Sequence, residues 1–109
     1  MVFLIVELRP CDICLGSPRR GFTLVRLAFG LAIKELRTAS GIAQERLAFE
    51  SDVDRGYMSG LEQGSHSPTL DTVMKLLWRL DVSVVDFAVV FERELKKKLK
   101  RRANNRPKP

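Results

Sequence analysis

The chain has 109 residues, of which 45% are hydrophobic and 29% are charged, and its net charge is +6. This length is enough for one domain with a small core and terminal extensions, and the lack of a continuous run of about 20 apolar residues excludes a transmembrane helix. Residues 93–109 hold nine Lys and Arg against one Glu, which leaves the other residues at −2, so the overall positive charge is weak evidence for a nucleic-acid ligand, although this tail alone can bind phosphate.

The first 22 residues form an extension before the predicted helices. Residues 1–8 form a short apolar run without the features of a signal peptide, and the prolines and glycines that follow predict a loop over residues 9–21. Cys11 and Cys14 have the spacing C-x-x-C, but a structural zinc needs four ligands and the single His66 lies far away. We interpret them as ordinary thiols, and we expect a cytoplasmic protein with no metal and no cofactor.

The next two predicted helices cover residues 23–40 and 43–50. Thr23 is a suitable N-cap for the first, and apolar residues recur at helical spacing behind it. Gly41 follows the first helix, where a left-handed residue ends a helix favourably. In the second helix, Leu47 and the small Ala48 are predicted to face the core, so that another helix can cross closely.

The third predicted helix covers residues 55–63 and follows a tight turn. Asp54 is a good N-cap for it, Met58 and Leu61 are spaced to face the core, and Gly64 is placed to end it. Its remaining side chains are predicted to face outward. Two short helices joined by a tight turn, the second with a polar outer side, are typical of a DNA-reading unit.

Two more helices complete the prediction. Ser67 as N-cap with Pro68 in the first turn starts the fourth, with Thr69 as a competing cap and Leu70 as the first residue of its core stripe. Trp78 is predicted to cover an edge of the core or to contact a second subunit. A fifth helix is expected from about residue 83 to 101. This helix carries more apolar residues than one small core can cover. We therefore expect some of them to form a dimer surface, which consists of Val84, Phe87, Phe91 and Leu95.

The sequence therefore predicts an all-α fold of five helices with an extended C-terminal helix. We divide the chain into an extension at 1–22, a helix-turn-helix domain at 23–92 and a basic tail at 93–109.

The motifs over residues 25–88 resemble the Cro and phage-repressor family, also called the xenobiotic-response-element family, whose fold is lambda-repressor-like. Within that family, residues 54–62 are similar to the recognition helix of restriction–modification controller proteins. The positions that carry this resemblance are Gln44, Leu47, Ala48, Asp54, Arg55, Tyr57 to Glu62, Gly64 and Pro68 to Leu70.

The resemblance implies a role for individual residues. Gln44 matches a glutamine that contacts a phosphate, Arg55 matches a base-contacting position where arginine can bind guanine through two hydrogen bonds, and Arg37 and Glu62 match a structural ion pair. His66 stands where controller-like relatives often have arginine. The residues that we expect at the DNA interface are Ala43, Gln44, Asp54, Arg55, Gly56, Tyr57, Ser59, Gly60 and His66.

Some of these positions depart from the family pattern. Ala43 replaces the usual Ser or Thr, which removes the side-chain cap of the second helix. Gly56 and Gly60 stand where long polar side chains often read DNA, so Arg55 is expected to carry most of the direct readout.

We therefore expect a homodimeric, sequence-specific regulator of transcription that binds double-stranded DNA and no membrane. The alternative is an antitoxin-like module that binds a protein partner through its N-terminal segment or its last helix, with DNA binding secondary. An enzyme that uses Cys11 and Cys14 is the weakest hypothesis, because the sequence shows no accompanying base, metal cluster or phosphate-binding loop. We expect no enzymatic activity and no catalytic residue.

Overall fold

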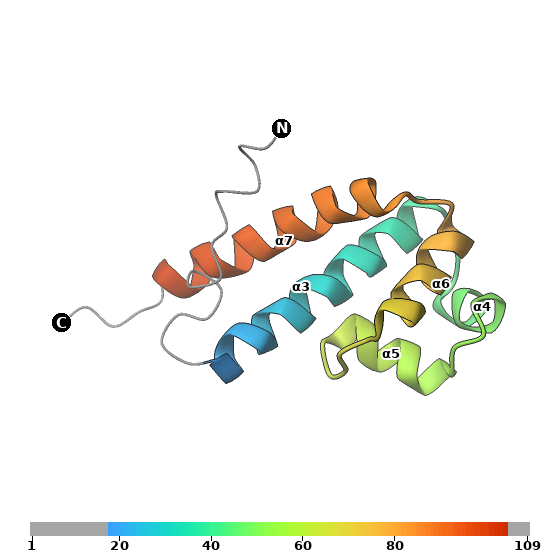
Figure 1. Cartoon of the computed structure of the whole chain (residues 1–109), viewed down its shortest axis with the longest axis horizontal. Coiled ribbons are helices and arrows are strands. Elements are labelled where there is room, and N and C mark those ends of the chain that lie inside the picture. Colours follow the sequence, from blue (N-terminus) through green and yellow to red (C-terminus); the bar gives the residue numbers. More distant parts are fainter. Residues whose placement is uncertain (1–17, 105–109) are drawn as a thin grey trace.

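The computed structural model describes residues 18–104, which contain five helices and no strand (Figure 1). The two long helices, α3 and α7, lie side by side, and the three shorter helices gather at one end of them. This arrangement confirms the predicted all-α fold of five helices. The helices are α3 (Pro18–Ala39), α4 (Gln44–Glu50), α5 (Arg55–Gln63), α6 (Leu70–Leu80) and α7 (Val84–Asn104).

Helix α3 begins five residues before the predicted N-cap at Thr23. Its first residue is Pro18, and a proline is well tolerated in the first helical turn because the missing N–H has no intrahelical partner there. The predicted loop is therefore wrong for residues 18–21. The predictions for residues 1–17, including Cys11 and Cys14, lie outside the described residues.

The turn between α4 and α5 is built from local backbone geometry. Asp52 has a left-handed φ of 57°, and the amide of Val53 returns to the carbonyl of Ala48 at 2.9 Å. Asp54 is extended, and its carboxylate accepts the amide N–H of Tyr57 at 3.2 Å, which caps α5 as predicted. These bonds fix the direction in which α5 leaves the turn.

Helix α6 begins at Leu70, and Thr69 is its N-cap, with its hydroxyl accepting the amide N–H of Thr72 at 3.3 Å. The competing cap is therefore the right one, and Ser67 is not. Leu70 is 81% exposed, so its predicted place in the core is also wrong. The first turn of α6 lies beyond the core, and the buried stripe of this helix consists of Leu76, Leu77 and Leu80.

The core lies where α3 crosses α5, with Ile33, Leu47 and Leu61 fully buried in it. The crossing is close because Gly30 of α3 has no side chain. A Cβ at this position would lie 2.6 Å from the carbonyl oxygen of Glu62 and would also clash with the backbone of Leu61. Gly30 therefore permits α5 to contact the backbone of α3 directly.

Helix α7 packs against α3 along its length (Figure 1). Phe87 is 8% exposed, with its ring edge-on to Phe29 at a centroid distance of 5.6 Å, and it stacks on the half-buried Phe91. Leu95 is 4% exposed. The predicted dimer surface is therefore wrong for Phe87 and Leu95, because α3 of the same chain supplies the packing partner of this helix. Val84, by contrast, is 53% exposed.

The basic segment at 93–109 begins within α7, which runs on to Asn104 without a break. Arg93 forms an ion pair with Glu35 of α3, and Lys97 lies 3.6 Å from Glu94 on its own helix. Part of the positive charge of α7 is thus balanced within the fold.

Candidate nucleic-acid interface

A buried carboxylate fixes the orientation of α5. Glu62 accepts two hydrogen bonds from Arg37 of α3, from Nε to Oε1 at 2.6 Å and from Nη2 to Oε2 at 3.3 Å. The side chain of Glu62 is only 5% exposed and that of Arg37 only 12%. Gln44 of α4 donates its amide to the same carboxylate at 2.5 Å, and Arg37 also donates to the carbonyl of Ile42 at 2.8 Å. The network therefore joins α3, α4 and α5 at one point.

Arg55 is the first residue of α5, and its side chain is 75% exposed. Its guanidinium lies 3.3 Å from Oε1 of Glu45, an exposed residue in the first turn of α4. The sequence did not indicate this partner, because no helical spacing relates two residues on opposite sides of a turn. The pair leaves most of the guanidinium free to bind another group.

Tyr57 and His66 form an aromatic stack on the surface of α5. Their ring centroids are 5.0 Å apart and their planes differ by 18°. The imidazole lies over Gly60, where a Cβ would come within 2.5 Å of its Nε2. Gly60 is buried, and His66 covers it in the free chain, so a contact between Gly60 and DNA stays a prediction.

The other predicted interface residues differ in their exposure and in whether their side chains are already hydrogen-bonded within the chain. Ala43 is extended and gives α4 no side-chain cap, as expected from the missing hydroxyl. Gly56 is exposed, Ser59 is half-buried and accepts the amide of Gln63 at 3.4 Å, and the carboxylate of Asp54 is engaged as a cap. The outer side of α5 therefore presents Arg55, an open backbone at Gly56, and the half-buried Tyr57 and Ser59.

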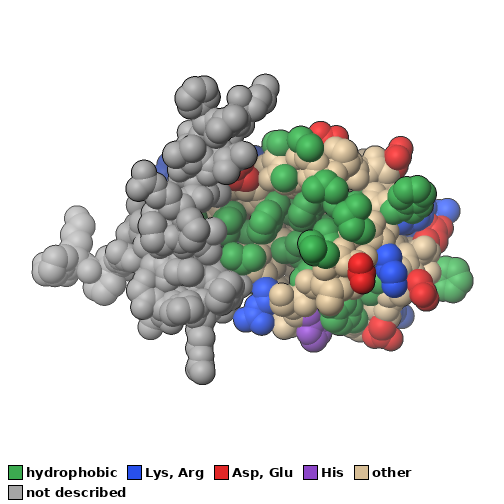
Figure 2. Space-filling view, in the orientation of Figure 1, with side chains coloured by type: hydrophobic (Ala, Val, Ile, Leu, Met, Phe, Trp, Pro, Cys, Tyr) green, Lys and Arg blue, Asp and Glu red, His purple; other side chains and the backbone are tan. Residues whose placement is uncertain are grey.

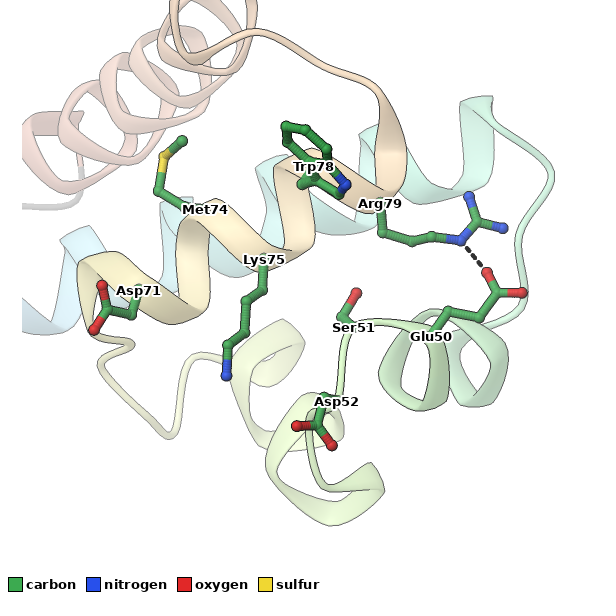
Figure 3. A pocket seen from close by; sticks show the side chains of 8 residues that line it. All are labelled: Glu50, Ser51, Asp52, Asp71, Met74, Lys75, Trp78 and Arg79. Carbon is green, nitrogen blue, oxygen red and sulfur yellow. Dashed lines mark hydrogen bonds and ion pairs between the residues drawn. The ribbon is translucent and has the colours of Figure 1, made fainter.

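An ion-pair chain joins α4 to α6. Glu50 pairs with Arg79 of α6 (Figure 3) and also with Arg46 of its own helix. Hydrogen bonds from Arg79 and then from Arg46 hold the pKa of Glu50 below its ordinary value. Because the pKa is lowered on folding, this stabilisation is present at neutral pH and is lost as the pH falls through the folded-state pKa. No spacing in the sequence indicates this role of Glu50, because Arg79 lies on another helix.

Two negative observations concern the described part of the chain. Residues 18–104 contain no helix long and apolar enough to cross a bilayer. The same residues contain no group of three or more His, Cys, Asp or Glu side chains that could hold a metal ion.

A short helix, a tight turn and a second helix with an exposed polar side, braced by a third, define a helix-turn-helix domain. Residues 33–87, half of the chain, match the family model described as helix-turn-helix. The chain belongs to this helix-turn-helix family, as the sequence motifs predicted.

The relatives of this chain include controllers of restriction–modification systems. It is 36% identical over 77 residues to control protein C.BamHI of Bacillus amyloliquefaciens, a match that covers 67% of this chain and 95% of the relative. Among solved structures, the controller protein C.AhdI of Aeromonas hydrophila is 41% identical with a TM-score of 0.54, over 56% of this chain and 92% of that one. The controller C.Esp1396I, solved as a tetramer with its natural 35-base-pair operator, is 32% identical with a TM-score of 0.61, over 65% of this chain and 93% of that one. The predicted likeness to controller proteins is confirmed.

Proposed function

We propose that this chain is a cytoplasmic, sequence-specific regulator of transcription, which binds double-stranded DNA as a dimer and inserts α5 into the major groove. The observation that carries the proposal is the exposure of Arg55 at the N-terminus of a helix that Arg37, Gln44 and Glu62 hold rigidly. An exposed arginine on a fixed helix can be aimed at a base edge without a large loss of conformational entropy. The operator-bound structure of the relative C.Esp1396I supports this use of the fold.

The interface divides into groups that position the protein and a group that reads sequence. The amide of Gln44 donates inward to Glu62, which leaves its carbonyl and the N-terminus of α4 beside the DNA-facing side. Tyr57 and Ser59 supply hydroxyls for phosphate or base-edge contacts. Arg55 is the one long cationic side chain on α5, so we assign it the main base contact, through two hydrogen bonds to a guanine.

We place the dimer surface on α6 and the start of α7. Trp78 is 88% exposed and Met74 is 49% exposed, one turn apart on α6. Figure 3 shows both among the side chains that line a pocket between α6 and the end of α4, together with Glu50. Val84, Val85 and Val89 of α7 are exposed as well, and Figure 2 shows that hydrophobic side chains gather on one face of the molecule. A second copy would cover these groups and place two α5 helices one DNA turn apart.

The direct test measures binding of the purified full chain to DNA from upstream of its own gene. Fluorescence anisotropy with a labelled duplex, at moderate salt, is compared with a scrambled duplex of the same composition. We expect at least about a thousand-fold preference for the upstream DNA, the lower end of the range of specific regulators. Equal affinity for both duplexes at every salt concentration would contradict the proposal, because phosphate contacts alone carry no sequence information.

A further inference from the structure

The sole tyrosine of the chain, Tyr57, has an unusual neighbour. On α5, the position one turn after it is Gly60, which offers no side chain to support the tyrosine ring. The space is filled from another segment, because His66 of the following loop lies over Gly60 and stacks on Tyr57 with ring centroids 5.0 Å apart. The half-buried Tyr57 therefore packs against the core and is also covered by a ring from outside the helix.

The loop that carries His66 is itself fixed to α5. Gly64 ends the helix with a φ of 82°, and the amide N–H of Ser65 donates to the carbonyl oxygen of Gly60 at 2.8 Å. These features place His66 directly above Gly60. A side chain at residue 60 would occupy the same space, since its Cβ would lie 2.5 Å from the imidazole Nε2. The stack of His66 on Tyr57 therefore requires a glycine at residue 60.

We propose that His66 is a positioning residue of the DNA interface, and that its imidazole, seated on Gly60, holds the ring of Tyr57 in the orientation that contacts DNA. The inference rests on the proposed function and adds a role for His66 through Tyr57. Gly60 leaves the space that the imidazole occupies, because it has no side chain. The competing role for His66 is a direct contact with DNA. That role requires the polar nitrogens of the imidazole, whereas the positioning role requires only a flat ring.

The first measurement needs no DNA. Because Tyr57 is the only tyrosine, its ring protons can be followed by NMR in the free protein. His66→Ala removes the stacked ring and should shift these resonances, whereas His66→Phe keeps a flat ring and should leave them shifted as in a stacked pair. Gly60→Ala should act like His66→Ala, because the added methyl displaces the imidazole. Unaltered Tyr57 resonances in both alanine variants would overturn the proposal.

The second measurement is the ratio of affinities for upstream and scrambled DNA. We expect His66→Ala and Gly60→Ala each to lower this ratio about two- to ten-fold, the size of one aromatic pair, and His66→Phe to retain it. In a Tyr57→Ala background, His66→Ala should have no further effect. If His66→Phe is as harmful as His66→Ala, or if the loss persists without Tyr57, then His66 contacts DNA directly and the positioning role is refuted.

Two controls separate this proposal from others. Ser65→Ala changes the exposed neighbour of His66 and should alter neither measurement, since only the backbone of Ser65 bonds to α5. Circular dichroism of Gly60→Ala, whose added methyl favours the helix, checks that a loss of specificity does not come from unfolding. If the unaltered protein shows no preference between the duplexes, the proposed function fails. If that preference exists and the His66 variants keep it, only the positioning role fails.

Discussion

At the scale of single residues, we propose that base recognition depends chiefly on Arg55. Replacement by alanine removes a side chain that is 75% exposed, so the stability of the fold should hardly change. We expect Arg55→Ala to lower the discrimination between upstream and scrambled DNA by about 1–3 kcal/mol, the worth of one bidentate contact with guanine. Anisotropy titrations of both duplexes check this. Lys34→Ala, which removes an exposed cation from α3, is the matched control and should leave discrimination intact.

If Arg55 contacts DNA as proposed, Glu45 competes with DNA for the same guanidinium. Its Oε1 lies 3.3 Å from Arg55 in the free protein, and both side chains are exposed. Glu45→Gln removes a negative charge beside the phosphates and releases Arg55, so we expect several-fold tighter DNA binding at low salt and a smaller gain at high salt. The gain should vanish in an Arg55→Ala background. Weaker binding by Glu45→Gln would show instead that Glu45 orients the arginine for contact.

The sequence supports some of these residue assignments better than others. Arg55 and Gln44 lie at positions set by the helix-turn-helix motif, so their places could be predicted from spacing. The pairing of Glu45 with Arg55 spans the turn between two helices, and the stack of His66 on Tyr57 depends on a loop conformation. Neither follows from helical periodicity. Gly60 was interpreted as a bare reading position because its occupation by the ring of another residue is a tertiary contact.

At the scale of the helices, the ion pair between Arg37 and Glu62 determines how α5 is held. The two side chains are 12% and 5% exposed, so loss of one partner leaves a buried charge without compensation. We expect Arg37→Ala to lower the free energy of unfolding by about 3–5 kcal/mol. Urea denaturation, followed through the far-ultraviolet circular dichroism of the five helices, measures the change.

A double substitution separates the pair from its surroundings. Arg37→Met combined with Glu62→Leu removes both charges and keeps apolar volume, so it should cost less stability than Arg37→Ala alone. It also removes the acceptor of the Gln44 amide, so α4 loses its link to α5. If Arg37→Ala costs under about 1 kcal/mol, the pair behaves as a surface ion pair and does not brace the recognition helix.

The sequence predicted the interior of the helices better than their ends. Capping residues located α5 at both ends, because the carboxylate of Asp54 accepts an amide of the first turn and Gly64 adopts the left-handed conformation that ends a helix. The first turns of α3 and α6 were misplaced, since Thr23 and Ser67 were each plausible caps by type alone. Gly30 was missed as a contact point, because a glycine inside a helical stripe shows its use only when the crossing helix is in place.

At the scale of the whole molecule, the packing partner of α7 differs from the one that the sequence predicted. A long apolar stripe on the last helix suggested a surface for a second subunit. The stripe instead packs on α3, with Phe87 against Phe29, and α3 is long enough to accompany α7 because it begins at Pro18. The apolar groups left exposed lie partly on α6, where Trp78 is 88% exposed. The candidate surface for self-association therefore moves to α6 and the exposed valines of α7.

This change of surface leads to a prediction about assembly. Trp78→Ser should convert the dimer to a monomer in sedimentation velocity, because a large aromatic side chain at the centre of an interface contributes about 2 kcal/mol or more. The fold of the monomer should persist, since the indole contributes little to the core. Affinity for a duplex with two half-sites should fall by about a hundred-fold or more, because the two reading helices no longer bind as a linked pair. Binding to a single half-site should change much less.

Phe49 provides a matched control for this prediction. It is 86% exposed on α4, so Phe49→Ser removes a comparable exposed aromatic group from another helix. We expect this variant to sediment as the unaltered protein does. If Trp78→Ser also leaves the sedimentation coefficient unchanged while the upstream DNA is still recognised, a different surface joins the subunits. If Trp78→Ser yields a monomer that loses only the preference for paired half-sites, then α5 reads the DNA and α6 sets the spacing at which two copies read it.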